Sequence, residues 1–193
     1  MNGISKQILQ SDRFFLKTLV GALLIYSVIG IPFFIGYMAR HLHQQSQGRG
    51  AELPVWNHWL ALLIESWELI LAILAYAVFP CGVLGWLALS IDQWFGFLWI
   101  LVWLPFTLSL LVAPVFVSLA YHRYLDKGTW DSMFELPILY RQFIATIDDT
   151  LPATMMFWGA MLLGFPVFGF TIAASAMIYM SFSITAIAAS RYR

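Results

Sequence analysis

Two carboxylates inside a long apolar stretch are the residues most able to do chemistry in this chain. Glu65 and Glu68 stand three residues apart, so on a helix they share one face. Because an ionisable group in hydrocarbon costs about a few kcal/mol or more, such a pair can mark a polar cavity or a proton path. Two alternatives stay open. A helix that begins at Trp56 would keep both carboxylates near the lipid headgroups on a wet face, or a basic residue of a partner would pair with them.

Four further residues are candidates for a functional or interface surface, namely Arg40, Trp56, Trp59 and Arg123. The tryptophans suit the water–lipid boundary, where an indole buries its rings and still donates a hydrogen bond. The two arginines give positive character to polar segments that follow apolar ones.

Motifs for enzymatic chemistry are not found in the sequence. It contains no glycine-rich phosphate loop, no G-x-S-x-G, no H-E-x-x-H and no C-x-x-C. His41 and His43 are two residues apart, which puts them on different faces of a helix, and they could join His58 in a metal site only if the loop folded back. We therefore expect solvated loop histidines, no metal, no cofactor and no enzymatic activity.

Composition indicates the class of protein. The 193 residues are 61% hydrophobic and 10% charged, whereas an ordinary soluble domain is about 25% charged. A bilayer-spanning helix needs roughly 20 apolar residues, so the apolar segments suffice for about four to six crossings. We expect an all-α polytopic integral membrane bundle of transmembrane or re-entrant helices, forming a single domain over residues 1–193. The formal net charge of zero gives no reason to expect a nucleic-acid partner.

The chain alternates between apolar runs and polar islands. The runs cover about 14–38, 60–81, 94–120, 152–166 and 168–190, and the islands cover 39–59 and 121–150. Gly30-Ile31-Pro32 should break or kink the first run, because proline removes a donor and clashes with the preceding turn. Pro105 and Pro114 are compatible with one tilted, kinked span in the third run. Gly164-Phe165-Pro166 should divide the last stretch into two short helices.

Capping patterns predict where other helices begin. Ser90-Ile91-Asp92-Gln93 has the form of a capping box and predicts a helix start. Residues 131–135 offer another capping box, opening a short interfacial amphipathic helix that reaches Ile147. Residues 148–152 then offer caps and an early proline for a separate helix. The N-terminal residues 4–16 mix apolar and basic residues as expected of a short helix at the lipid interface.

Basic residues predict the orientation in the membrane. Both islands carry arginines, whereas the turn at residues 90–93 has no Lys or Arg, so the islands are expected to be cytoplasmic and the turn external. A hairpin over the last stretch would return Arg191 and Arg193 to the cytoplasmic side of the cell membrane. The basic N-terminus would then lie outside if the first run crosses once.

The two islands share a layout. Each follows a proline-containing apolar run, turns basic at Arg40 or Arg123, passes a glycine and resumes with Trp56 or Trp130. This suggests an internal duplication with a unit of about 75 to 85 residues, a symmetry found in many polytopic membrane proteins.

The order of several motifs resembles the DUF4013 family of prokaryotic membrane proteins. The motifs are Ser11-Asp12, Gly21-Ala22-Leu23-Leu24, Ile31-Pro32, Gly36-Tyr37-Met38-x-Arg40, Leu53-Pro54-x-Trp56-x-x-Trp59, Ile64-Glu65, Tyr121-x-Arg123-Tyr124, Trp130-x-x-x-Phe134 and Ser190-Arg191-Tyr192. The resemblance covers almost the whole chain and implies a polytopic membrane fold and a bacterial or archaeal origin, but no reaction. Family members typically have glycine after the acidic residue and often lysine soon after, where this chain has Ser66 and Glu68.

Two functions of different class fit these observations. The first is a non-catalytic accessory or scaffold subunit that packs against the lipid bilayer and against other membrane protein subunits or its own copies. Abundant aromatics, small-residue helix faces and scarce intramembrane charge favour it. The second is a small transporter or channel that uses the Glu65/Glu68 face. The transporter requires an enclosed polar cavity at these carboxylates, whereas the packing protein leaves them at the headgroup boundary.

Overall fold

The computed structural model describes residues 13–48, 53–94, 99–163 and 168–190, and within these ranges every regular element is helical. The elements are α2 (Phe14–Tyr26), α3 (Ile31–Ser46), α4 (Trp59–Ile73), the π-helical turn η1 (Leu74–Val78), α5 (Phe79–Asp92), α6 (Trp99–Lys127), the 3₁₀ turn η3 (Trp130–Phe134), α7 (Leu136–Leu163) and α8 (Phe168–Ser190). The all-α prediction is therefore confirmed for the described residues. The predicted N-terminal interfacial helix and the C-terminal Arg191 and Arg193 lie wholly or mostly outside them.

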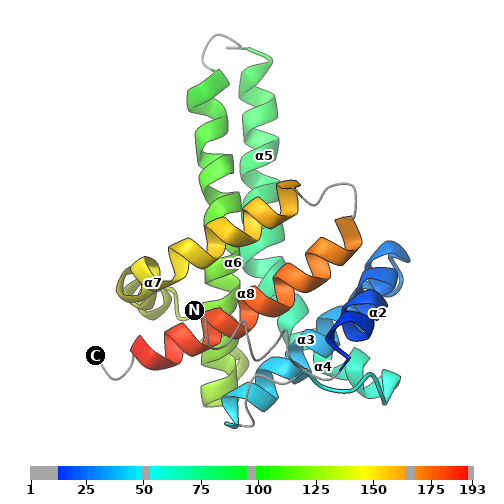
Figure 1. Cartoon of the computed structure of the whole chain (residues 1–193). Helices are drawn as coiled ribbons and strands as arrows, with labels where there is room; N and C mark the ends of the chain where they lie inside the picture. The colour runs from blue at the N-terminus through cyan, green and yellow to red at the C-terminus, as the bar shows by residue number, and fades with distance from the viewer. Residues whose placement is uncertain (1–12, 49–52, 95–98, 164–167, 191–193) are drawn as a thin grey trace.

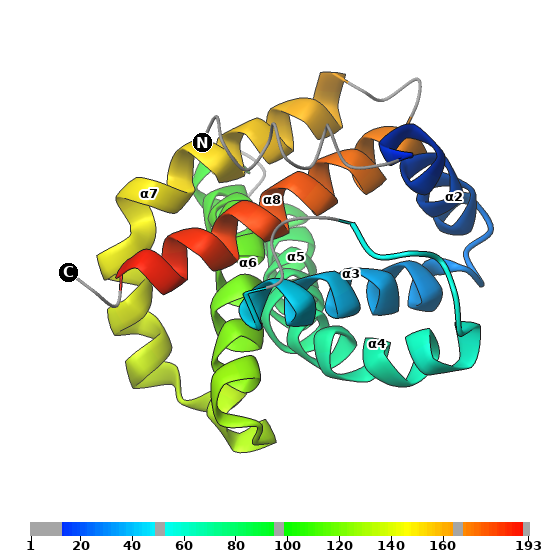
Figure 2. The ribbon, with the colours of Figure 1, turned by 60° about the horizontal axis from the view of Figure 1, so that its bottom comes forward.

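A helical hairpin stands out from the rest of the fold. Figure 1 shows α5 and the neighbouring half of α6 rising together, while α3, α7 and α8 lie across their base. Figure 2, turned so that the bottom comes forward, shows α5 strongly foreshortened, with α3, α4, α7 and α8 spread around the hairpin. Because α5 packs chiefly against α6, the outer faces of this hairpin have no protein neighbour in the described structure.

The chain bends between α4 and α5 without leaving the helical state. The unbroken helical stretch Trp59–Asp92 is 34 residues long, and α4 runs beside α3 whereas α5 runs beside α6 (Figures 1 and 2). The π turn η1 inserts an extra residue into the helical ladder, and Pro80 follows in the first turn of α5, where it lacks a donor. Both are recognised causes of a helix bend.

The predicted break in the first apolar run is confirmed. α2 ends at Tyr26, and α3 begins at Ile31 with Pro32 in its first turn. The Ser27 hydroxyl donates to the Leu24 carbonyl and accepts from the Gly30 backbone amide, which closes the intervening turn. The helix α3 nevertheless continues into the first polar island as far as Ser46. Its buried face, including Leu42, packs into the core, so tertiary contacts carry the helix beyond the apolar run.

Two predicted helix starts are wrong. Ser90 does not cap a new helix: it lies inside α5, and its hydroxyl donates to the Trp86 carbonyl four residues back. The second island does not hold a separate short helix either, because α7 runs unbroken for 28 residues with Pro152 inside it. Thr150 and Thr154, on either side of the proline, are both buried, so the packing of α7 continues across Pro152.

The predictions for the third apolar run and for the last stretch agree with the described helices. One helix passes through Pro105 and Pro114, as expected for the third run. The last stretch holds two helical segments, the end of α7 and all of α8, which pack against each other. The Gly164-Phe165-Pro166 break itself lies outside the described residues.

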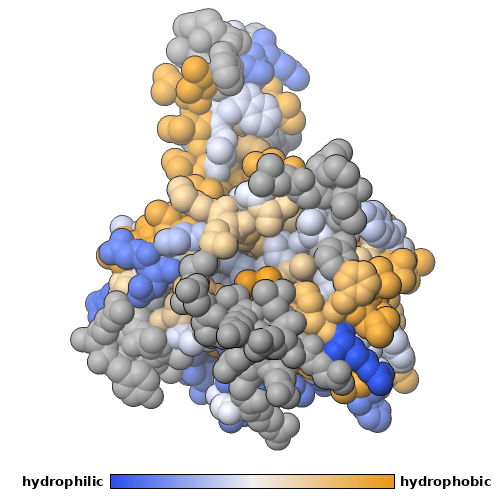
Figure 3. All heavy atoms as spheres, viewed as in Figure 1, coloured by the Kyte–Doolittle hydropathy of each residue, from blue (hydrophilic) through white to orange (hydrophobic). Residues whose placement is uncertain are grey.

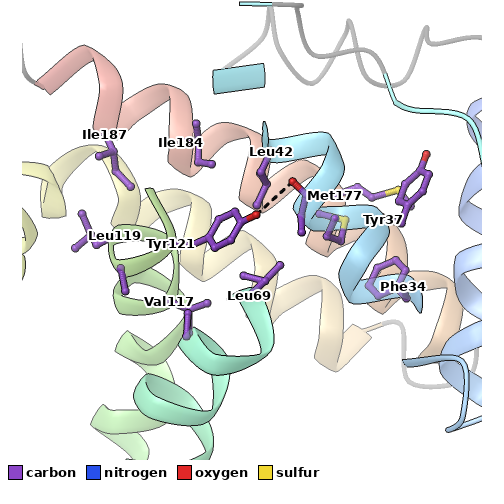
Figure 4. Packing of buried hydrophobic residues seen from close by; sticks show 14 of the residues in the cluster. Phe34, Tyr37, Leu42, Leu69, Val117, Leu119, Tyr121, Met177, Ile184 and Ile187 are labelled. Carbon is purple, nitrogen blue, oxygen red and sulfur yellow. Dashed lines mark hydrogen bonds between the residues drawn. The ribbon is translucent and has the colours of Figure 1, made fainter. Parts of the chain in front are cut away.

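The core lies where α3, α4, α6 and α8 meet. Figure 4 shows side chains from these helices converging, among them Leu42, Leu69, Leu119 and Met177. The Tyr121 hydroxyl donates to the Ala39 carbonyl over 3.4 Å, drawn as the dashed line, and so ties α6 to α3.

Two helices are long and apolar enough to cross a membrane, Trp59–Asp92 and Trp103–Lys127. Only 11% of the most apolar window of the first is buried. Figure 3 shows apolar side chains along the projecting hairpin. Such extensive apolar exposure is typical of a surface that meets lipid or another protein. The larger number of four to six crossings is not established by these helices.

Candidate functional site

A polar pocket lies between α3, α4 and the end of α6. Its volume is about 490 Å³, within the usual range of roughly 300–1,000 Å³ for ligand sites. The residues that line it are Ala39, Arg40, His43, Gln44, Gln47, Ile64, Glu65, Glu68, Tyr121, Tyr124, Leu125 and Gly128. The fold thus brings three of the predicted site residues, Arg40, Glu65 and Glu68, to one place.

Arg40 on α3 and Glu65 on α4 form a two-pronged ion pair. The arginine Nε lies 2.8 Å from Oε2 and the terminal NH2 nitrogen 2.9 Å from Oε1. The other terminal nitrogen, NH1, donates to the backbone carbonyl and side-chain oxygen of Asn57, at 3.1 and 3.0 Å. The exposed fractions of the two charged side chains are 14% for Arg40 and 39% for Glu65. The pair therefore sits at the rim of the bundle, and its geometry is that of the stronger bidentate pairs.

Glu68 has a different environment from Glu65. Its Oε1 accepts a hydrogen bond of 3.2 Å from the Tyr124 hydroxyl. Among the described residues, no cationic side chain forms an ion pair with it. Since Arg40 is matched by Glu65, the pocket retains the formal negative charge of Glu68.

Glycine at position 36 allows the two helices that carry the pair to come close together. A Cβ at Gly36 would lie 1.8 Å from the Leu62 carbonyl oxygen. The backbones of α3 and α4 therefore touch at this level, one turn before Arg40. This close approach fixes the distance across which the ion pair forms.

The predicted tryptophans lie together, away from the pocket. Trp56 stacks on Tyr37, with ring centroids 3.9 Å apart, and Trp59 stacks next to it at 5.8 Å. The Trp56 indole donates to the Lys17 carbonyl, and the Lys17 ammonium donates to the Leu53 carbonyl. The Tyr37 hydroxyl donates to the Pro54 carbonyl over 2.9 Å. These tryptophans thus tie α2 and α3 to the segment that leads into α4.

Arg123 is not part of the pocket lining and belongs to a separate cluster of charged side chains. It donates to the Glu135 carboxylate and to the Ser132 carbonyl, and Lys127 binds the same carboxylate at 2.8 Å. The hydrogen bond from Lys127, with the positive charges of Arg123 and Lys127, lowers the pKa of Glu135. The cluster closes the turn between α6 and α7, which is a structural role.

The histidines do not behave alike. The expectation of a solvated loop histidine is wrong for His41, which lies on the buried face of α3 with Nε2 2.6 Å from the Ser181 hydroxyl of α8. His43 is at the wall of the pocket and bonds Gln47, and His58 precedes α4. Within the described ranges no three His, Cys, Asp or Glu side chains are grouped to hold a metal ion.

Sequence reasoning did not identify the tyrosines of the pocket as site residues. Tyr121 and Tyr124 are three residues apart and so share a face of α6, the same spacing that drew attention to Glu65 and Glu68 on α4. The three-residue spacing of Tyr121 and Tyr124 was the one sequence signal for this pair. It does not predict that α6 faces α4 across the pocket.

A second, apolar cavity of about 260 Å³ lies further along the same helices. Met38, Leu69 and Val117 line it, each one to four residues from a residue of the polar pocket. Neighbours from α7 and α8, including Trp158 and Tyr179, complete its wall. The polar groups of the pocket thus give way to hydrocarbon toward the projecting hairpin.

Over the described residues the fold is all-helical, two of its helices are long and apolar enough to cross a membrane, and a polar pocket lies between α3, α4 and α6. The chain belongs to the DUF4013 family, described as a protein of unknown function, whose match extends over residues 19–178. The family resemblance drawn from the sequence is therefore confirmed. No curated protein and no solved structure matches the chain.

Proposed function

We propose that this protein is a non-catalytic integral membrane protein that serves as an accessory or scaffold subunit, packing against partner membrane proteins or lipid. The observation that carries the proposal is the projecting α5–α6 hairpin. Large apolar side chains cover its outer faces, such as Phe79 at 71% and Trp86 at 67% exposed. Burying such a side chain is worth about 1.5–3 kcal/mol, so the hairpin gains strongly from an apolar surrounding.

The proposed setting is the cell membrane, with several passes and with the polar pocket on the cytoplasmic side. Arg40, Arg123 and Lys127 all lie near the pocket end of the bundle, whereas the tip of α5 carries Asp92 without a basic residue. The positive-inside rule favours this orientation. Four to six crossings would require α2, α3, α7 or α8 to enter the bilayer as well. Partner subunits or further copies of the chain would cover the hairpin, and no nucleic acid is involved.

Transport is the second candidate, because Glu65 and Glu68 do line one pocket. Two observations weigh against it. The Glu65 carboxylate is matched by Arg40 at the rim, and the next cavity along the helices is apolar. An ion would lose its polar partners on entering that cavity.

Site-specific photocrosslinking in native membranes tests the scaffold proposal. A photoreactive phenylalanine at Trp86 on the hairpin should yield a discrete protein adduct, identifiable by mass spectrometry as a partner or a second copy. The matched control places the same group at Tyr140, an exposed aromatic near the start of α7. Adducts with lipid alone from Trp86, together with ion or solute flux that is lost in the Glu65→Gln/Glu68→Gln variant after reconstitution, would overturn the scaffold role in favour of transport.

A further inference from the structure

We propose that the polar pocket binds an organic ammonium group, either free or as a lipid headgroup. The charge of the pocket points to a cationic ligand. Glu65 is held by both prongs of Arg40, which also bonds Asn57. Among the described residues, the hydrogen-bond donor to the Glu68 side chain is the phenol hydroxyl of Tyr124. The charged side chains that line the pocket therefore leave one carboxylate to be neutralised by a ligand.

Two tyrosines, Tyr121 and Tyr124, line the pocket beside that carboxylate. Their rings lie 6.1 Å apart at an angle of 33°, and Trp130, outside the lining, packs edge-on against Tyr124 at 6.0 Å. Aromatic faces beside a carboxylate are the usual surroundings of a bound ammonium, because ring quadrupole and anion attract the same cation. Tyr121 is buried and anchored to the Ala39 carbonyl, so this wall is preformed.

The groups that line the pocket suit an ammonium better than a metal ion. A divalent cation needs several converging oxygen ligands, and the oxygens of Glu65 are occupied by Arg40. The side-chain amides of Gln44 and Gln47 add hydrogen-bonding groups at the rim. A volume of about 490 Å³ suits a small organic headgroup better than a bare ion. This site does not depend on what covers the hairpin.

The binding experiment uses the full chain purified in a neutral detergent. Choline is titrated calorimetrically, and the probe for a charge-independent fit is 3,3-dimethylbutan-1-ol, which has the same shape without the charge. Saturable choline binding that the neutral alcohol does not reproduce is expected. No saturable choline binding, or equal binding of the alcohol, would overturn the proposal without any mutation.

Variants locate the site. Glu68→Gln should weaken choline binding by about tenfold or more, since a charge pair a few Å apart is removed. Asp148→Asn, an exposed carboxylate on α7 outside the pocket, is the matched control. Equal choline affinity in a folded Glu68→Gln variant and the parent would refute the assignment.

A second arm distinguishes the source of the ammonium. Native mass spectrometry from nanodiscs containing equal phosphatidylethanolamine and phosphatidylglycerol measures which lipid stays bound. Enrichment of phosphatidylethanolamine that Glu68→Gln abolishes assigns a lipid headgroup. Choline binding without such enrichment assigns a free amine.

Discussion

Replacing Gly36 by alanine tests the contact that positions the pocket. The substitution adds one methyl group where α3 meets the α4 backbone, and that methyl carbon would lie 1.8 Å from the Leu62 carbonyl oxygen and 2.6 Å from its carbon. A backbone carbonyl inside a helix cannot rotate away as a side chain can. The two helices must therefore separate locally.

The size of the effect follows from these distances. Non-bonded carbon contacts are most favourable at about 3.5–4.0 Å, so the helices must separate by roughly 1.5 Å. Overpacking costs typically about 1–3 kcal/mol, occasionally more, and the backbone clash places Gly36→Ala at or above the upper end. Alanine regains about 1 kcal/mol through its higher helix propensity. We expect a net loss of about 2 kcal/mol or more in the free energy of unfolding.

Thermal unfolding in detergent, monitored by tryptophan fluorescence, measures the loss of stability in Gly36→Ala. The matched control is Gly159→Ala. A Cβ at Gly159, inside α7, meets nothing within 4 Å, so this variant should be unchanged or more stable by up to about 1 kcal/mol. The separation at Gly36 should also weaken the Arg40–Glu65 pair. A Gly36→Ala protein that melts at or above the parent temperature would refute the reasoning.

Three further outcomes are expected in the same assay. Tyr76→Phe removes the 2.6 Å hydrogen bond to the carbonyl of the buried Met133 and should lower stability by about 1 kcal/mol; an unchanged melting temperature would contradict that bond. Glu135→Gln tests the lowered pKa of Glu135, which the hydrogen bond from Lys127 chiefly causes. A carboxyl with a lowered folded pKa stabilises above its unfolded pKa of about 4.3 and loses this as the pH falls through the folded value. The parent should therefore lose more stability than Glu135→Gln as the pH falls below that value, and parallel curves would count against it. Ala113→Leu fills the apolar cavity of about 260 Å³ and should raise stability by roughly 1 kcal/mol; a lower melting temperature would show that the cavity cannot accept the larger side chain.

Local patterns predicted the helices better than their ends. The apolar runs and the Gly30-Ile31-Pro32 break gave helices where the structure has them. Ser90 shows why ends are harder: a serine before an apolar run can cap a new helix or bond back to its own helix, and the choice depends on whether the preceding turn is already packed. The helix start predicted at residues 148–152 was wrong for a similar reason. Buried residues on both sides of Pro152 keep α7 helical through a residue that usually interrupts a helix. The proposed duplication stays a prediction.

Some residues of the candidate site could be predicted from the sequence, whereas their arrangement could not. Charges inside apolar helices are costly, so Arg40, Glu65 and Glu68 could be singled out from their surroundings alone. That Arg40 would meet Glu65, 25 residues away in the chain, depends on the close approach of α3 and α4 at Gly36. The tyrosines opposite come from a helix about 60 residues further along, and only the fold places them.

The bend at η1 has a mechanical consequence. The carboxylates of the pocket and the apolar face of the hairpin belong to one unbroken helical rod, Trp59–Asp92. The arm beyond the bend, α5, has 14 residues and is about 21 Å long at 1.5 Å per residue. A pivot of about 10° at the π turn would therefore sweep the tip of this arm sideways by about 4 Å. In such a pivot the displacement would be largest at the tip of α5, because the tip lies furthest from the π turn.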